Sequence, residues 1–184
     1  PNTVQSHGVE AQQVSFQLCQ RGLLWNLGVD GSSASEHRVR VSHQDLRSWD
    51  GGEDRAPYDL ITGTPPYFPQ DCFVASENHS QKIRCRVPTR GAASEYVQAA
   101  ARLLATDGIF VMVETARKEG EQAVLERAKS CNLQVIRRLD IVTNTGLPPR
   151  FSCWVMRRRR QAQDDDNSQQ VFDLHLLRYE MWIK

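Results

Sequence analysis

Apolar residues recur along the chain with two different periods, and stretches of the two kinds alternate. In some stretches they fall three or four residues apart, which is the spacing of one helix face, and in others they alternate or form short unbroken runs typical of strands. Helices are predicted over residues 12–27, 92–105 and 119–129, and strands over residues 3–9, 38–42, 58–62, 109–114, 133–142 and 151–156. Residues 171–183 form a further apolar element whose type the pattern leaves open.

The alternation of strands with helices predicts an α/β fold. We expect a doubly wound, mainly parallel sheet with helices on both faces and an antiparallel last strand. The unbroken apolar run at residues 109–114 is typical of a buried parallel strand, which we expect to begin after a turn at Asp107–Gly108. The last two predicted strands are joined by residues 143–150 without a helix, so we expect them to pair antiparallel. Gly28 is the predicted cap at the end of the first helix.

Composition narrows the range of functions only slightly. The 184 residues suggest one domain, and their 40% hydrophobic and 24% charged content is ordinary for a globular protein. A net charge of +1 excludes a global field that attracts nucleic acid, so any basic patch is local. The five cysteines form no CxxC pair and the five histidines show no ligand spacing, so we expect no metal site. No apolar run is long enough for a membrane span and no signal peptide is visible, which predicts a cytoplasmic protein, with an organelle as the open alternative.

The most informative segment is ITGTPPYFP, at residues 61–69. It places three prolines and an aromatic pair directly after a predicted strand, and prolines fix their own backbone torsions. In open parallel sheets, ligands bind outside the carboxyl ends of the strands. Three other strand ends carry acidic residues, at Glu10, Asp45 and Glu114. Each acid alone is also compatible with a helix cap or a solvated turn, but the order of the four strand ends favours a binding site.

The run DLITGTPPYFP resembles motif IV of the class I S-adenosylmethionine-dependent methyltransferases that modify exocyclic or amide nitrogens, (Asp/Asn/Ser)-Pro-Pro-(Tyr/Phe/Trp). It is most similar to the branch that includes the tRNA adenine methyltransferases, and the resemblance covers roughly residues 1–157. It implies a Rossmann-like methyltransferase fold with S-adenosylmethionine as cofactor. It also implies methylation of an exocyclic amine of a nucleic-acid base, with adenine in RNA as the leading substrate.

The resemblance assigns catalytic roles to three residues of the motif. The Thr64 hydroxyl and the Pro65 carbonyl are expected to accept hydrogen bonds from the target amine. The Tyr67 ring is expected to stack on the base, a contact worth ~1–3 kcal/mol. Thr64 departs from the family's Asn, Asp or Ser, although a threonine hydroxyl can also accept a hydrogen bond. The alternative is a Pro-Pro turn that packs on an aromatic ring and has no catalytic role.

The resemblance also implies a cofactor site. Glu10 is expected to bind the ribose hydroxyls and Asp45 the adenine amine, with Gln44 or Leu46 beside the adenine ring and Thr64 against the cofactor. The family's glycine-rich GxGxG motif does not occur in the sequence. We therefore expect a methyltransferase domain over residues 1–160 without its first strand and glycine loop. A polar linker over residues 161–170 and a C-terminal element of the same domain over residues 171–184 are expected to follow.

Basic residues after the motif indicate a nucleic-acid partner. Lysine and arginine side chains are the usual phosphate ligands, so the expected phosphate contacts are Lys82, Arg84, Arg86 and Arg90. Phe68, in the motif itself, is a further expected substrate contact. The run of arginines at residues 157–160 adds positive charge, as do Arg137, Arg138 and Arg150, although a solvated loop or strand end explains such residues equally well. Two other functions remain open: a protein glutamine-amide methyltransferase, and a non-catalytic module that binds RNA or another partner.

Overall fold

The computed structural model describes residues 4–28, 38–52, 57–66, 91–160 and 176–180. The chain divides into two compact units, residues 1–49 and residues 50–184. The predicted polar linker at residues 161–170 lies outside the described residues. None of the helices in the described ranges is long and apolar enough to span a membrane.

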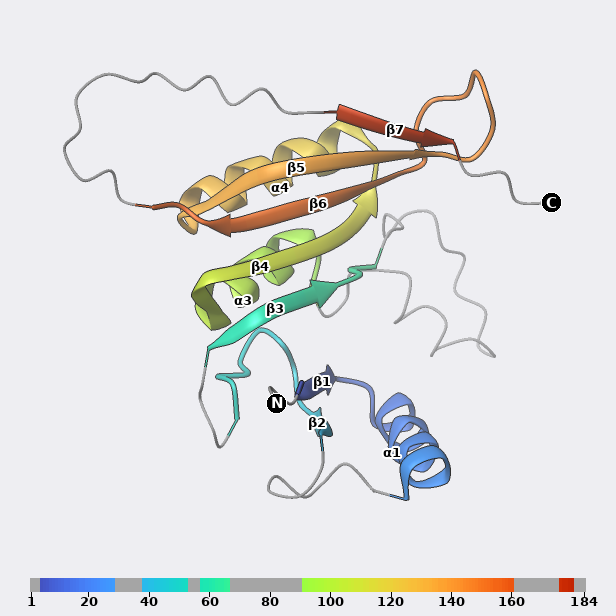
Figure 1. The fold of residues 1–184 in the computed structure, drawn as a ribbon, viewed down its shortest axis with the longest axis vertical. Coiled ribbons are helices and arrows are strands. Elements are labelled where there is room, and N and C mark those ends of the chain that lie inside the picture. The colour runs from blue at the N-terminus through green and yellow to red at the C-terminus, as the bar shows by residue number, and fades with distance from the viewer. Residues whose placement is uncertain (1–3, 29–37, 53–56, 67–90, 161–175, 181–184) are drawn as a thin grey trace. The chain divides into compact units, whose positions relative to one another are not determined.

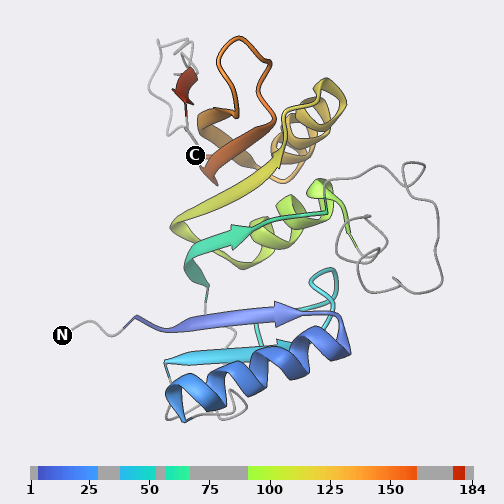
Figure 2. The same cartoon turned by 90° about the vertical axis from the view of Figure 1, so that its right-hand side faces the viewer.

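The first unit is a two-stranded parallel sheet with one helix packed on it (Figure 2). β1 (Ser6–Glu10) runs beside β2 (Val39–His43), with Ser6 opposite Val39 and Glu10 opposite His43. The helix α1 (Gln13–Leu27) connects the two strands along the chain and contacts both. It ends at Gly28, whose φ of 69° lies in the left-handed region that glycine adopts without strain. The predicted helix and its cap are confirmed.

The second unit contains a mixed five-stranded sheet in the order β3-β4-β6-β5-β7 (Figure 1). Its strands are β3 (Tyr58–Gly63), β4 (Leu104–Thr115), β5 (Leu133–Val142), β6 (Phe151–Arg158) and β7 (Leu176–Glu180). β3 and β4 are parallel, as are β5 and β7, whereas β6 is antiparallel to both of its neighbours. The predicted antiparallel pair is thus confirmed, and β6 lies inside the sheet between β4 and β5. The element that the pattern left open contains the strand β7.

Two helices cover one face of this sheet. α3 (Ala93–Leu103) and α4 (Lys118–Ser130) both lie behind the strands in Figure 1. The core of the unit forms between these helices and the strands, and its largest fully buried apolar side chains are Trp154, Phe110, Leu104, Met112, Leu133, Met156, Val97 and Val124. This layer of helices and strands fixes the positions of the strand ends that carry the candidate site.

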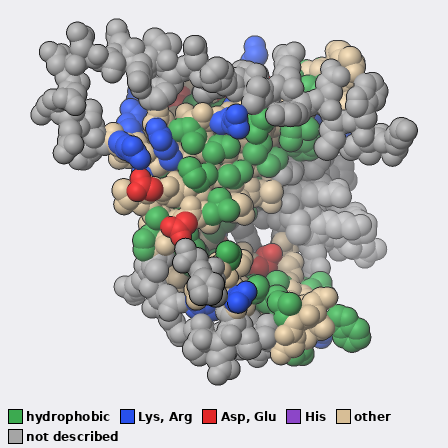
Figure 3. Space-filling model, in the orientation of Figure 1, with side chains coloured by type: hydrophobic (Ala, Val, Ile, Leu, Met, Phe, Trp, Pro, Cys, Tyr) green, Lys and Arg blue, Asp and Glu red, His purple; other side chains and the backbone are tan. Residues whose placement is uncertain are grey.

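The opposite face of the five-stranded sheet is apolar, and neither α3 nor α4 covers it. Figure 3 shows hydrophobic side chains gathered over this face, with Lys and Arg side chains toward one edge. Half-buried strand residues form it, among them Val111 and Val113 of β4 and Cys153 and Val155 of β6. Burial raises the pKa of the Cys153 thiol, so this cysteine stays protonated and unreactive at neutral pH.

The start of β4 differs from the prediction. The strand begins at Leu104 and not at Ile109, so the expected turn at Asp107–Gly108 falls inside it. The pairing with β3 moves from Tyr58–Leu104 to Leu60–Ile109, so β4 has extra residues that form a bulge. The local turn preference of Asp107–Gly108 is accommodated by this bulge because the neighbouring strand keeps the chain extended on both sides of it.

Candidate active site

The described part of the motif, residues 61–66, includes the last residues of β3 and continues beyond its carboxyl end. β4 runs parallel to β3 with Gly63 opposite Met112, so both strands end at the same edge of the sheet. Pro65 is fully buried, whereas Thr64 beside it is exposed. The Thr64 hydroxyl makes no hydrogen bond to any residue in the described ranges. A buried proline therefore anchors the chain just after β3, and the neighbouring Thr64 side chain is exposed to solvent.

The remaining predicted catalytic and substrate residues lie outside the described residues. These are Tyr67, Phe68, Lys82, Arg84, Arg86 and Arg90. Their roles stay predictions.

Glu114 lies at the same edge, at the carboxyl end of β4. Its side chain is only 7% exposed. Its Oε1 accepts hydrogen bonds from the Thr115 amide at 2.8 Å and from the Thr115 hydroxyl at 2.9 Å. The side chain also lies against Gly120, in the first turn of α4. Glu114 thus terminates β4 and supports the start of α4, rather than facing solvent beside Thr64.

Burial raises the pKa of the Glu114 carboxyl, while the hydrogen bonds from Thr115 and the charge of Arg117 oppose that rise. The folded state therefore holds the proton more tightly than the unfolded state does, and stability falls as pH rises from the unfolded pKa through the folded one. A glutamine side chain cannot ionise, so the Glu114→Gln variant should gain stability relative to the wild type between pH 4 and pH 7. Urea denaturation at the two pH values measures this gain. Glu119→Gln, an exposed change on α4, is the matched control, and an equal difference at both pH values for Glu114→Gln would contradict the prediction.

The two acids assigned to the cofactor share an edge of the β1–β2 sheet. β1 ends at Glu10, which is opposite His43, and Asp45 follows two residues after His43. Glu10 Oε1 accepts the Gln12 amide at 2.7 Å, just before α1 begins, and no described residue donates to Oε2. Asp45 is bound by Arg47, with Nε at 2.9 Å from Oδ1 and Nη2 at 2.6 Å from Oδ2.

These two acids fit the hydrogen-bonding needs of an adenosine group. A ribose hydroxyl donates to a carboxylate oxygen such as Oε2 of Glu10, and an adenine amine needs an acceptor such as Asp45. Asp45 accepts three hydrogen bonds from Arg47, one from its amide at 3.0 Å and two from its guanidinium, so an adenine amine would have to share or displace them. The ion pair with Arg47 is half exposed and contributes less than about 1 kcal/mol, so it adds little resistance to a ligand.

The basic residues outside the motif divide into structural and exposed ones. Arg138 is only 6% exposed and binds Glu121 and Asp140, so the expectation that it adds to a basic surface is wrong. Arg158 donates to the carbonyl oxygens of Ala101 and Leu104, which caps the end of α3. Arg137, Arg150, Arg159 and Arg160 are exposed.

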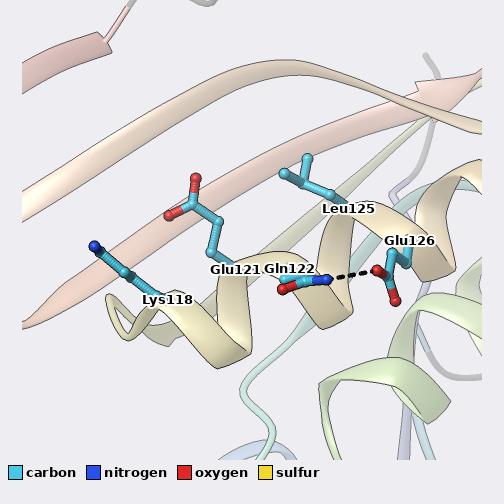
Figure 4. A pocket seen from close by; sticks show the side chains of 5 residues that line it. All are labelled: Lys118, Glu121, Gln122, Leu125 and Glu126. Carbon is cyan, nitrogen blue, oxygen red and sulfur yellow. Dashed lines mark hydrogen bonds between the residues drawn. The ribbon is translucent and has the colours of Figure 1, made fainter.

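A shallow hollow on the surface of α4 offers no alternative site. It is lined by five side chains of this one helix, Lys118, Glu121, Gln122, Leu125 and Glu126 (Figure 4). Gln122 donates to Glu126 at 2.9 Å, so part of the polar lining is already paired. The hollow does not include any strand end. Within the described ranges, no three His, Cys, Asp or Glu side chains gather as a metal ion requires.

Sequence reasoning missed two features at these edges. One is the contact of Tyr96 in α3 with Gly63, the residue just before Thr64. A glycine at the end of a strand, directly before the motif, was the available indication, because it often marks a close approach. The other is the ion pair of Arg47 with Asp45, for which the spacing of two residues was the only indication.

No family model matches the chain. A curated tRNA1(Val) (adenine(37)-N6)-methyltransferase of Bacteroides fragilis is 26% identical over 150 residues, which are 74% of this chain and 61% of the relative. The same enzyme from a second Bacteroides fragilis strain gives equal values. The chain thus spans about three fifths of the length of the curated relatives it matches.

Solved structures show the same fold at low sequence identity. A Listeria monocytogenes protein described as a class I S-adenosylmethionine-dependent methyltransferase aligns with a TM-score of 0.61 at 16% identity, over 97% of this chain and 50% of its own. An S-adenosylmethionine-dependent methyltransferase of Clostridium acetobutylicum gives 0.54 at 11% identity, over 85% and 76% of the two chains. The order of strands and helices and the similarity to these solved structures indicate the same fold. The chain has the fold of the class I S-adenosylmethionine-dependent methyltransferases and is similar in sequence to a tRNA adenine-N6 methyltransferase.

Proposed function

We propose that the chain is a methyltransferase that uses S-adenosylmethionine to methylate the exocyclic amine of a nucleic-acid base, with adenine in RNA as the substrate. The observation that carries the proposal is the exposed Thr64 hydroxyl, anchored by the fully buried Pro65 at the carboxyl end of β3. The similarity to a curated tRNA adenine-N6 methyltransferase supports the choice of RNA and of adenine.

The chemistry requires help from the protein because an exocyclic amine is a poor nucleophile. Its lone pair is delocalised into the ring, and hydrogen-bond acceptors that draw the two N–H groups out of the ring plane make the lone pair available. The Thr64 hydroxyl oxygen and the Pro65 carbonyl are proposed to act as these acceptors. The prolines hold both groups in a fixed geometry, so little ordering remains to be done when the substrate binds. Tyr67 is proposed to stack on the base.

S-adenosylmethionine, when bound, supplies an electrophilic methyl group. We propose that Glu10 binds its ribose through Oε2 and that Asp45 accepts a hydrogen bond from its adenine amine. Lys82, Arg84, Arg86 and Arg90 are proposed to contact RNA phosphates, and Phe68 to contact the base. Phosphate contacts of this kind make binding weaken as salt rises.

Replacing Thr64 tests the proposal directly. We expect Thr64→Ala to lower kcat about tenfold, the effect of losing one hydrogen bond of about 1.4 kcal/mol in the transition state. The assay incubates the chain with S-adenosylmethionine and unmodified tRNA, and nucleoside mass spectrometry measures N6-methyladenosine. Thr62→Ala makes the same change two residues earlier within β3 and should leave kcat unchanged.

Other outcomes of this assay would contradict the proposal. Equal rates for Thr64→Ala and the wild type would remove Thr64 from the mechanism. Methylation of glutamine in a protein substrate, with none in tRNA, would favour the amide methyltransferase. Binding of tRNA without binding of S-adenosylmethionine, measured by calorimetry, would favour a non-catalytic module.

A further inference from the structure

The ring of Tyr96 lies directly against the last residue of β3. A methyl carbon added to the Cα of Gly63 would lie 2.7 Å from Cδ1 of Tyr96 and 3.3 Å from Cε1. Real carbon atoms do not approach that closely, so the space that any other side chain would need at position 63 is filled by this ring. Gly63 directly precedes Thr64 and Pro65, so the contact sits at the base of the proposed catalytic turn.

The helix that carries Tyr96 is firmly held at this end. Glu95 Oε2 accepts hydrogen bonds from the Ala92 amide at 2.8 Å and from the Ser94 hydroxyl at 2.7 Å. Burial raises the pKa of Glu95, but the hydrogen bonds from Ser94, Ala92 and its own amide, together with the charge of Arg127, lower the net pKa, so the side chain is ionised at neutral pH. An ionised carboxylate in the first turn of a helix is also favoured by the helix dipole.

Packing in the core of the second unit anchors the part of α3 that carries Tyr96. Val97 and Ala100 are buried in the core of the second unit, and Tyr96 packs against that core. The Gly63 contact is thus made by a ring whose helix is anchored in the core of the second unit.

We propose that Tyr96 is a positioning residue. Its ring packs against the Cα of Gly63 and holds the end of β3, so that Thr64 and the Pro65 carbonyl keep the geometry needed for methyl transfer. This inference rests on the proposed function. A purely structural Tyr96 would stabilise the whole unit without a special effect on residues 61–64. Two measurements separate these roles.

The first measurement is amide hydrogen exchange, which needs no activity. Tyr96→Leu should speed exchange at residues 61–64 by about tenfold more than in the β5–β6 ladder, because the contact is local. Tyr96→Phe keeps the ring and should show a clearly smaller acceleration at residues 61–64 than Tyr96→Leu. Gln98→Ala, an exposed change on the same helix, is the control. Equal acceleration in both regions, no acceleration, or Tyr96→Phe behaving like Tyr96→Leu would overturn the proposal.

The second measurement is a double-mutant cycle on methyl transfer. Gly63→Ala alone should lower kcat about tenfold because its methyl group clashes with the ring, and Tyr96→Ala alone should lower it through the lost support. The double variant removes the clash, so its loss should be clearly smaller than the product of the two single losses. KM for S-adenosylmethionine should stay unchanged in all three, because Glu10 and Asp45 are proposed to bind that group.

The outcomes distinguish failure of this inference from failure of the proposed function. If the wild type transfers no methyl group, the proposed function fails and the exchange pattern alone decides the role of Tyr96. If the wild type is active and the two single losses simply multiply, the proposed function stands and the positioning role is overturned.

Discussion

Replacing Arg138 with alanine is expected to lower the free energy of unfolding by about 3–5 kcal/mol, because it leaves a buried carboxylate without its partner. Arg138 Nε lies 2.8 Å from Oδ1 of Asp140, and its Nη1 lies 2.6 Å from Oε1 of Glu121. Asp140 is only 4% exposed, so its charge would be left in a largely desolvated site. Urea denaturation followed by circular dichroism measures the loss.

The neighbouring arginine provides a matched control. Arg137 is exposed on the same strand, and Arg137→Ala should change the free energy of unfolding by less than about 0.5 kcal/mol. Replacing the pair Arg138 and Asp140 together by methionine and leucine should recover only part of the loss, since well-packed apolar groups often substitute for a buried ion pair but the buried Ser152 hydroxyl then loses its acceptor. Similar losses for Arg138→Ala and Arg137→Ala would show that the buried network contributes little.

The second large effect is expected at Trp154, the largest fully buried side chain of the core. Trp154→Ala should lower the free energy of unfolding by about 3–5 kcal/mol, through lost transfer free energy and the cavity that remains. Trp154→Phe should cost less, because it keeps an aromatic ring and its lost indole N–H has no described acceptor. Circular dichroism is the suitable probe, since the variants remove a fluorophore.

An exposed tryptophan serves as the control for this change. Trp25 in α1 is 89% exposed, and Trp25→Ala should leave the unfolding of the second unit unchanged. The guanidinium carbon of Arg138 lies 4.8 Å from the centroid of the Trp154 ring, so replacing either residue removes a contact of the other. Their effects should therefore not add in the double variant. Additive losses would indicate that this cation–π contact carries no energy.

Both residues lie on the face of the sheet that α3 and α4 cover, and this layer also positions the proposed site. Asp140 accepts a hydrogen bond from Ser152 at 2.7 Å, so the network ties β5 to β6. β6 in turn pairs with the carboxyl end of β4, where Glu114 is opposite Ser152. Loss of the network is expected to loosen the second unit as a whole, whereas loss of the Tyr96 ring is expected to loosen the end of β3 alone.

The sequence alone determined most of the elements and the place of the motif. Helical spacing between residues 12 and 27 predicted α1, and Gly28 predicted its end, because both features depend only on neighbours along the chain. The prolines after residue 62 predicted a rigid turn at a strand end, and the structure has Pro65 buried there. Glu10 and Asp45 were expected at one edge because parallel strands end on the same side, and their two strands are parallel.

Only the tertiary structure decided which elements meet. The insertion of β6 between β4 and β5 depends on pairing across long stretches of chain, and no local pattern encodes that order. Arg138 appeared as one more cation in the sequence, and its burial follows from Asp140 beside it, Glu121 in α4 and Trp154 in β6. The contact of the Tyr96 ring with Gly63 likewise joins two residues that are far apart in the sequence. It forms only because α3 packs against β3. Periodicity and turn chemistry act within a few residues, whereas burial and contact depend on distant residues that only folding brings together.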